Sequence, residues 1–302
     1  MNQPTLRTLF AALVAVLTAC TKEREAAPQN LASAAPPIVR LSIAGHTFQA
    51  PDTIIAGWTT FRFANHGDDI HYAHIVRLDS KRTVPELLEA YALAIRTSGA
   101  RPAWVKRFGG PGGAAPGDSS NVTEYLEPGS YVWICPVEDS SGTPHFSKGE
   151  FTTFVVRATS PNATGQASAP VASAGIRLTD FTFTLEAPLK AGHQTISVQN
   201  GGMQPHDLVM LKLAPGKTLD EVRRFLNPER ARRPDEASQP HPSFESLVAK
   251  GGGGIAAIAS GMKVFFAADL PAGDYVLACM ATAPDGRSHI EHGMIQQIRV
   301  LP

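Results

Sequence analysis

The most constraining feature of this sequence is that much of it occurs twice. Two runs of residues recur at fixed spacings, which indicates a chain built from two copies of one unit. In the first run the spacing is 135 positions: Ala56, Gly57, Asn65, His71 and Thr83 recur as Ala191, Gly192, Asn200, His206 and Thr218. In the second run it is 144 positions: Leu126, Gly129, Tyr131, Cys135 and His145 recur as Leu270, Gly273, Tyr275, Cys279 and His289. We therefore predict two domains, repeat 1 (37–157) and repeat 2 (172–302), joined by a Ser-, Ala- and Pro-rich linker over 158–171.

The composition favours β-structure and argues against a nucleic-acid partner. The 302 residues include 26 glycines and 24 prolines, about 17% together against about 12% in an average protein. Such an excess is typical of turn-rich β-proteins rather than helix bundles. The 27 basic residues balance 27 acidic ones, so the chain lacks the basic excess that phosphate binding requires.

Apolar runs and alternations predict β-strands at matching positions of the two repeats. In repeat 1 they cover 39–43, 59–63, 71–78, 131–135 and 151–156, and in repeat 2 they cover 176–179, 195–198, 206–213, 275–279 and 295–300. One helix is expected in each repeat, because Thr83 with Glu86 and Thr218 with Glu221 form capping boxes. Each repeat is therefore predicted to be a β-sandwich of about seven strands with a short helical insert.

The N-terminus is typical of a bacterial lipoprotein. Arg7 precedes an apolar run over 9–17, which is too short to span a bilayer, and the segment 1–19 ends in Leu-Thr-Ala before Cys20. This sequence matches a lipoprotein cleavage box, so Cys20 is the predicted lipidation site and 20–36 a flexible tether. An ordinary secretory signal with a chance cysteine is the alternative. Either leader predicts an oxidising envelope compartment, and lipidation predicts a membrane-anchored protein facing the periplasm or the cell surface.

Repeat 2 carries, in the order His, Cys, His and Met, the imidazole and sulfur side chains that can ligate a metal. His206 begins a predicted strand, and the C-terminal region supplies Cys279, His289 and Met294. A thiolate, two imidazoles and a weak axial thioether are the donors of a blue copper site. Sulfur favours Cu(I) and imidazole suits Cu(II), so this set predicts a copper site that can change oxidation state.

Repeat 1 carries a variant of this set. His71, Cys135 and His145 occupy the matching positions, but Glu150 stands where repeat 2 has methionine. A carboxylate is a harder ligand, or no ligand at all, and it favours an oxidised or redox-inert ion. The sequence leaves open whether repeat 1 holds copper, another metal such as zinc, or none.

Two stretches of repeat 2 resemble cupredoxins, the superfamily of blue copper proteins. Residues 200–207 read Asn-Gly-Gly-Met-Gln-Pro-His-Asp, similar to the cupredoxin segment in which an asparagine precedes a Pro-His pair. The last loop and strand resemble those of plastocyanin-like, azurin-like and copper nitrite reductase domains. The resemblance covers most of both repeats and implies an all-β chain of two tandem cupredoxin-like Greek-key sandwiches. It also implies that His206, Cys279 and His289 are equatorial copper ligands and Met294 the axial one.

The same residues allow other interpretations. Cys135 and Cys279 could be buried small hydrophobes, or they could form a disulfide with each other. His74 is expected to be structural or exposed, and His292 to be a bystander or an outer-layer neighbour of the site. Two glycine-rich runs, 109–113 and 251–254, match no nucleotide-binding fingerprint and are predicted to be long turns.

The favoured function is a copper-binding, one-electron carrier with an unidentified redox protein partner. No histidine adjoins Cys135 or Cys279, so the relay of multicopper enzymes is missing and an enzyme is not expected. The alternatives are a copper-delivery protein without redox cycling and a metal-free interaction module. A nitrite-reductase-like enzyme is a weaker alternative, which would have to gather further histidines from His66, His74, His193 and His292.

Overall fold

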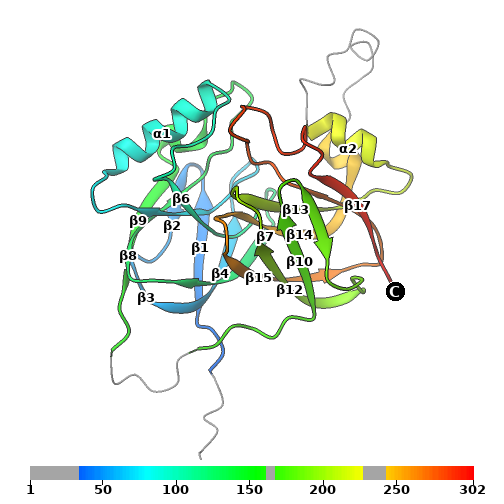
Figure 1. Cartoon of the computed structure of the whole chain (residues 1–302), viewed down its shortest axis with the longest axis horizontal. Helices are drawn as coiled ribbons and strands as arrows, with labels where there is room; N and C mark the ends of the chain where they lie inside the picture. Colours follow the sequence, from blue (N-terminus) through cyan, green and yellow to red (C-terminus); the bar gives the residue numbers. More distant parts are fainter. Residues whose placement is uncertain (1–33, 161–166, 227–242) are drawn as a thin grey trace, which may run out of the picture. The chain divides into compact units, whose positions relative to one another are not determined.

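The computed structural model describes residues 34–160, 167–226 and 243–302 (Figure 1). The predicted signal peptide, Cys20 and most of the tether lie outside the described residues. Both repeats lie within one compact unit, Ser33–Pro302. In the described ranges, no helix has the length and apolar character needed to cross a bilayer.

The described chain is mostly β-strand, as predicted, with one helical excursion in repeat 1 and a corresponding one in repeat 2. The elements of repeat 1 are β1 (Ile38–Ala44), β2 (Thr47–Gln49), β3 (Thr53–Ile55), β4 (Gly57–Asn65), β5 (His74–Leu78), α1 (Val84–Arg96), β6 (Lys106–Gly109), β7 (Ser119–Leu126), β8 (Gly129–Ile134), a 3-10 turn (His145–Lys148) and β9 (Phe151–Arg157). Those of repeat 2 are β10 (Ala174–Thr179), β11 (Thr182–Leu185), β12 (Gly192–Asn200), β13 (His206–Leu213), α2 (Leu219–Leu226), α4 (Phe244–Leu247), β14 (Val248–Ile258), β15 (Lys263–Leu270), β16 (Gly273–Ala278) and β17 (Ile295–Val300).

The strands form two sheets that each run through both repeats. One has eight strands in the order β11-β10-β12-β15-β7-β4-β1-β2, and the other has nine in the order β17-β16-β13-β14-β6-β5-β8-β9-β3. Inward-facing side chains of the two sheets pack against each other, as Phe61 of β4 does on Trp133 of β8 with ring centroids 5.1 Å apart. The all-β fold class is therefore confirmed: two packed sheets, each with strands from both repeats, enclose a continuous core.

The contacts between the repeats are reciprocal. Thr123 of β7 pairs with Phe265 of β15, and the side-chain amide of Asn121 both donates to and accepts from the backbone of Ala267 at 2.8 Å. At the spacing of 144, Asn121 corresponds to Phe265 and Thr123 to Ala267. Exchanging the two repeats therefore turns the Thr123–Phe265 contact into the Ala267–Asn121 contact. Such reciprocal contacts are typical of a two-fold interface.

The glycine-rich runs lie where strand backbones approach closely. Gly251–Gly254 lies inside strand β14, so the prediction of a long turn was wrong there. A Cβ on Gly254 would lie 2.0 Å from the carbonyl oxygen of Leu208 on β13, and one on Gly112 would lie 2.8 Å from the backbone of Gly254. Only glycine allows this spacing, because any side chain would collide with a neighbouring backbone.

Local sequence signals set most of the element ends. Strands β13 and β17 occupy the predicted ranges. In both capping boxes a backbone N–H donates to glutamate, from Thr83 to Glu86 at 2.7 Å and from Thr218 to Glu221 at 2.9 Å. The strand predicted over 71–78 begins later than expected, because β5 starts at His74. His71 lies before it and forms only an isolated bridge to Ala114.

Candidate metal centres

Three neighbouring strands deliver the candidate ligands of repeat 2. Cys279 follows β16, and Met294 precedes β17, its antiparallel partner. The two ends of the connecting loop, Cys279 and Met294, therefore lie side by side, and the loop between them carries His289. Strand β13, which begins at His206, pairs with the other side of β16. The four residues thus gather at one end of the sandwich, and His206, Cys279, His289 and Met294 define centre 2.

In centre 2 the thiol and two imidazole nitrogens converge. The Nδ1 atoms of His206 and His289 lie 3.0 Å apart, and the Cys279 Sγ lies 3.3 Å from His289 Nδ1 and 3.7 Å from His206 Nδ1. All three residues are fully buried. Donor atoms at this mutual spacing fit a single metal ion, because each could move onto one central atom with little rearrangement.

The outer edges of both imidazoles are held by hydrogen bonds. His206 Nε2 lies 2.6 Å from Asp180 Oδ1, and His289 Nε2 lies 3.2 Å from Gln204 Oε1. Such partners fix the ring orientation and leave Nδ1 free to face inward. Phe181 packs edge-on against His289 with ring centroids 5.0 Å apart, and it stacks on His292 at 4.3 Å. His292 therefore occupies an outer layer, behind Phe181.

Met294 is fixed through its backbone beside Cys279. Its carbonyl accepts from the Cys279 N–H at 3.2 Å, and its own N–H donates to the His289 carbonyl at 2.8 Å. The side chain is fully buried in the core. Its role as axial ligand remains a prediction.

Burial sets the charge state of centre 2. It raises the pKa of the Cys279 thiol, an effect that the nearby Asp207 carboxylate adds to. Burial also lowers the pKa of His206 and, helped by His206 itself, lowers that of His289 to about 3. At neutral pH both imidazoles therefore have free lone pairs, and only the thiol has a proton to release when a metal binds.

Repeat 1 gathers its four predicted residues in the same way, and His71, Cys135, His145 and Glu150 define centre 1. Each offers a donor atom within 4.8 Å of the others, and all four are buried. Glu150 Oε1 lies 2.7 Å from His71 Nδ1, and its Oε2 lies 3.4 Å from His145 Nδ1. The backbone of Glu150 makes the same two hydrogen bonds as Met294, to Cys135 and to His145, both at 3.2 Å. The Glu150 carboxylate and the Met294 thioether are therefore carried by equivalent backbone positions of the two repeats.

Sequence reasoning missed His46, which lies in the turn between β1 and β2. Its Nδ1 is 3.1 Å from Glu150 Oε2, and its ring centroid is 5.2 Å from that of His145. Position 46 corresponds to Phe181 at the spacing of 135. The repeat therefore gave no signal for His46, because its counterpart is not a metal-ligating residue type.

Three other histidines in the described ranges, His66, His74 and His193, lie outside both centres. His74 contacts the Tyr72 ring, and burial, then Arg101 and Arg107, lower the pKa of His74 to about 3. His193 is 68% exposed and lies 3.0 Å from Asp269.

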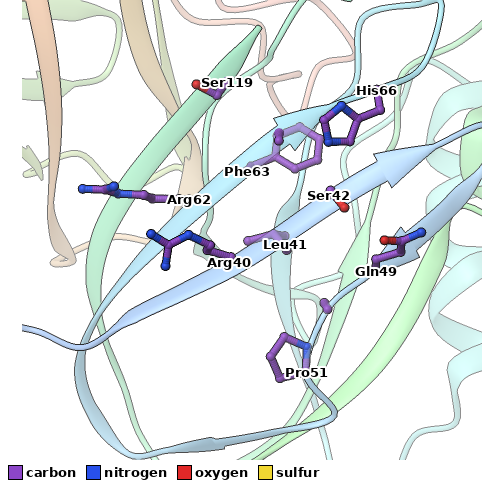
Figure 2. A pocket seen from close by; sticks show the side chains of 11 residues that line it. Arg40, Leu41, Ser42, Gln49, Pro51, Arg62, Phe63, His66 and Ser119 are labelled. Atoms are coloured by element: carbon purple, nitrogen blue, oxygen red, sulfur yellow. The ribbon is translucent and has the colours of Figure 1, made fainter. Parts of the chain in front are cut away.

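His66 belongs to neither centre. Figure 2 shows it among the residues that line a pocket beside β1 and β4, together with Arg40 and Arg62. Cys135 and Cys279 are both free thiols, so the alternative of a disulfide between them was wrong.

Comparison with known proteins gives only distant likenesses. No protein-family model matches the chain, and no curated protein matches it. Among solved structures, a reduced auracyanin from the photosynthetic bacterium Roseiflexus castenholzii is 17% identical, with 42% of this chain and 100% of that chain covered and a TM-score of 0.30. Auracyanin A, a "blue" copper protein from Chloroflexus aurantiacus, is 18% identical, with coverage of 40% and 99% and a TM-score of 0.29. A multicopper oxidase is 12% identical, with coverage of 87% of each chain and a TM-score of 0.22.

Proposed function

We propose that this protein binds copper at centre 2 and carries single electrons in the bacterial envelope. The observation that supports the proposal is the convergence of one buried thiol and two inward-turned imidazole nitrogens within 3.7 Å of one another. Copper held there would supply a one-electron couple. Thiolate and imidazole together suit both of its oxidation states, which is what a carrier requires.

The chain's own residues favour small rearrangement during electron transfer. Asp180 and Gln204 hold the two imidazoles from outside, and Phe181 packs edge-on against His289. Water is kept away from the donors, because His206, Cys279 and His289 have no exposed surface. Because the donors are hydrogen-bonded from outside and shielded from water, their positions should change little when the charge of the ion changes.

Catalysis is a poorer fit to this site. A relay to a second metal would need a histidine beside the cysteine, but Cys279 lies between Ala278 and Met280 and Cys135 between Ile134 and Pro136. We therefore propose a carrier rather than an enzyme, with a redox protein as partner. Lipidation at Cys20, proposed from the sequence, would hold the protein at a membrane surface.

The proposal is tested by loading residues 21–302 with Cu(II) and recording visible and EPR spectra. We expect an intense thiolate-to-copper band that disappears in Cys279→Ala and persists in Cys135→Ala, the matched variant of the other repeat. A chain that binds copper without any such band would contradict the proposal. A chain that binds no copper would favour the metal-free interaction module.

Copper delivery without redox cycling is the second candidate. It is favoured by Met203, which lies in the loop that leads to His206 and is 86% exposed. A surface thioether is a soft donor that suits Cu(I). Voltammetry distinguishes the two functions, since a carrier gives a reversible one-electron couple and a delivery protein binds Cu(I) tightly without one.

A further inference from the structure

Centre 1 contains a cluster of three imidazoles around one buried carboxylate. The Nδ1 atoms of His71, His46 and His145 lie 2.7, 3.1 and 3.4 Å from the nearer oxygen of Glu150. The three residues come from separate parts of repeat 1, namely the β1–β2 turn, the segment before β5 and the 3-10 turn. Each turns the same ring nitrogen toward Glu150, and this shared direction indicates a site for a positive ion.

Two of the differences between the repeats at this centre have the same chemical direction. Where repeat 2 has Met294, repeat 1 has Glu150, and where repeat 2 has Phe181, repeat 1 has His46. One change replaces a soft sulfur by a hard oxygen, and the other replaces an apolar ring by a nitrogen donor. Both move centre 1 from the donors of a blue copper site toward the nitrogen and oxygen donors of zinc sites.

We propose that centre 1 binds a redox-inert divalent cation of the Zn²⁺ class, with His46, His71, His145 and Glu150 as its nitrogen and oxygen donors. The Nδ1 atoms of His46 and His145 lie 3.1 and 3.4 Å from the same oxygen of Glu150, Oε2, close to the roughly 3.3 Å that separates two ligands of a tetrahedral zinc with bonds of about 2.0–2.1 Å. His71 Nδ1 lies 2.7 Å from the other oxygen, Oε1. Burial of a carboxylate among three imidazoles is costly without a compensating charge, and a divalent cation supplies that charge.

His46 also gives the site a connection to solvent. Its side chain is 37% exposed, whereas those of His71, His145 and Glu150 are at most 2% exposed. The ion therefore meets His46 first and the buried donors afterwards. Centre 2 has Phe181 in this place, a ring that is also half-buried but offers no donor atom.

The inference deepens the proposed metal-binding function, and its test is made independent of copper. Zn²⁺ affinity is measured by competition with a chromophoric chelator in a Cys279→Ala background, which disables centre 2, and Co²⁺ spectra report the donors. We expect one Zn²⁺ per chain. His46→Phe should weaken binding by about tenfold or more, and His46→Gln should do the same, while His193→Phe leaves the affinity unchanged.

Thermal unfolding of the metal-free variants separates loss of a donor from loss of fold. Because Phe181 occupies the matching place in repeat 2, we expect His46→Phe to fold, with an unchanged midpoint in the absence of metal. Unchanged Zn²⁺ affinity in both His46 variants would overturn the proposal, as would the absence of Zn²⁺ binding in the Cys279→Ala background. Failure of the copper band would leave this result standing, so the two proposals fail separately.

Discussion

Centre 1 and centre 2 share several backbone hydrogen bonds but have different donors. Asn65 and Asn200 hold the loops before His71 and His206 in the same way: each donates to two carbonyls and accepts from one backbone N–H. Glu150 and Met294 share both of their backbone hydrogen bonds. Backbone hydrogen bonds therefore fix where the donor atoms meet, while individual side chains decide which metal ion the donor atoms suit.

Exchanging side chains that differ between the centres should produce the largest effect. In a Cys279→Ala background, the double variant His46→Phe with Glu150→Met gives centre 1 the phenylalanine and the methionine of centre 2. We expect a thiolate-to-copper band that depends on Cys135 to appear where the background has none. Visible spectra after Cu(II) loading measure it. If the band fails to appear in a folded, copper-loaded variant, something other than these two residues separates the centres.

Metal affinity at centre 2 should depend steeply on pH. Burial raises the pKa of Cys279, so the metal-free site keeps its thiol proton and must release it on binding. Affinity is therefore expected to rise by about tenfold per pH unit through the neutral range, because one proton is released per ion. His289, with a pKa of about 3, adds no proton release there. Competition titrations with Cu(II), followed by the Cys279-dependent thiolate-to-copper band at pH 6, 7 and 8, check this slope, and a flat profile would contradict it.

The matched asparagines should contribute similar stability to the two repeats. Asn65→Ala or Asn200→Ala leaves buried backbone groups without partners and is expected to lower the free energy of unfolding by about 2–4 kcal/mol. Urea denaturation of the metal-free protein measures the loss. The exposed Gln297→Ala serves as a control and should stay within about 0.5 kcal/mol of the parent. A large difference between the asparagines would show that the two loops are held differently.

The smallest expected effect concerns the copper potential. Met294→Glu introduces at centre 2 the carboxylate of centre 1, which favours the oxidised ion. We expect the midpoint potential to fall by about 59 mV or more, equivalent to a tenfold change in relative affinity for the two oxidation states. Met294→Gln is the uncharged control. A potential unchanged by the carboxylate would argue against Met294 as the axial ligand.

The strands and the candidate donors could be predicted from the sequence because the repeat supplied each signal twice. His71 and Cys135 could be recognised as candidate ligands because they match His206 and Cys279 of the other repeat. His46 could not be recognised in the same way, because its partner Phe181 is not a ligand type and its turn carries no motif.

The junction between the repeats was also beyond sequence reasoning. Nothing in the pattern of β7 or β15 indicates that the two strands pair with each other. The glycines of β14 resemble turn residues until the backbone of β13 is seen beside them. Both features arise from tertiary packing, which overrides local preference.

The central claim, that the two centres divide soft and hard metal chemistry between them, is most directly tested by X-ray absorption. The chain would be loaded with one equivalent each of copper and zinc, and the neighbours of each metal measured separately. We expect a sulfur neighbour for copper that is lost in Cys279→Ala, and mainly nitrogen and oxygen neighbours for zinc that change in His46→Phe. Copper surrounded only by nitrogen and oxygen, or zinc spectra indifferent to His46, would contradict it.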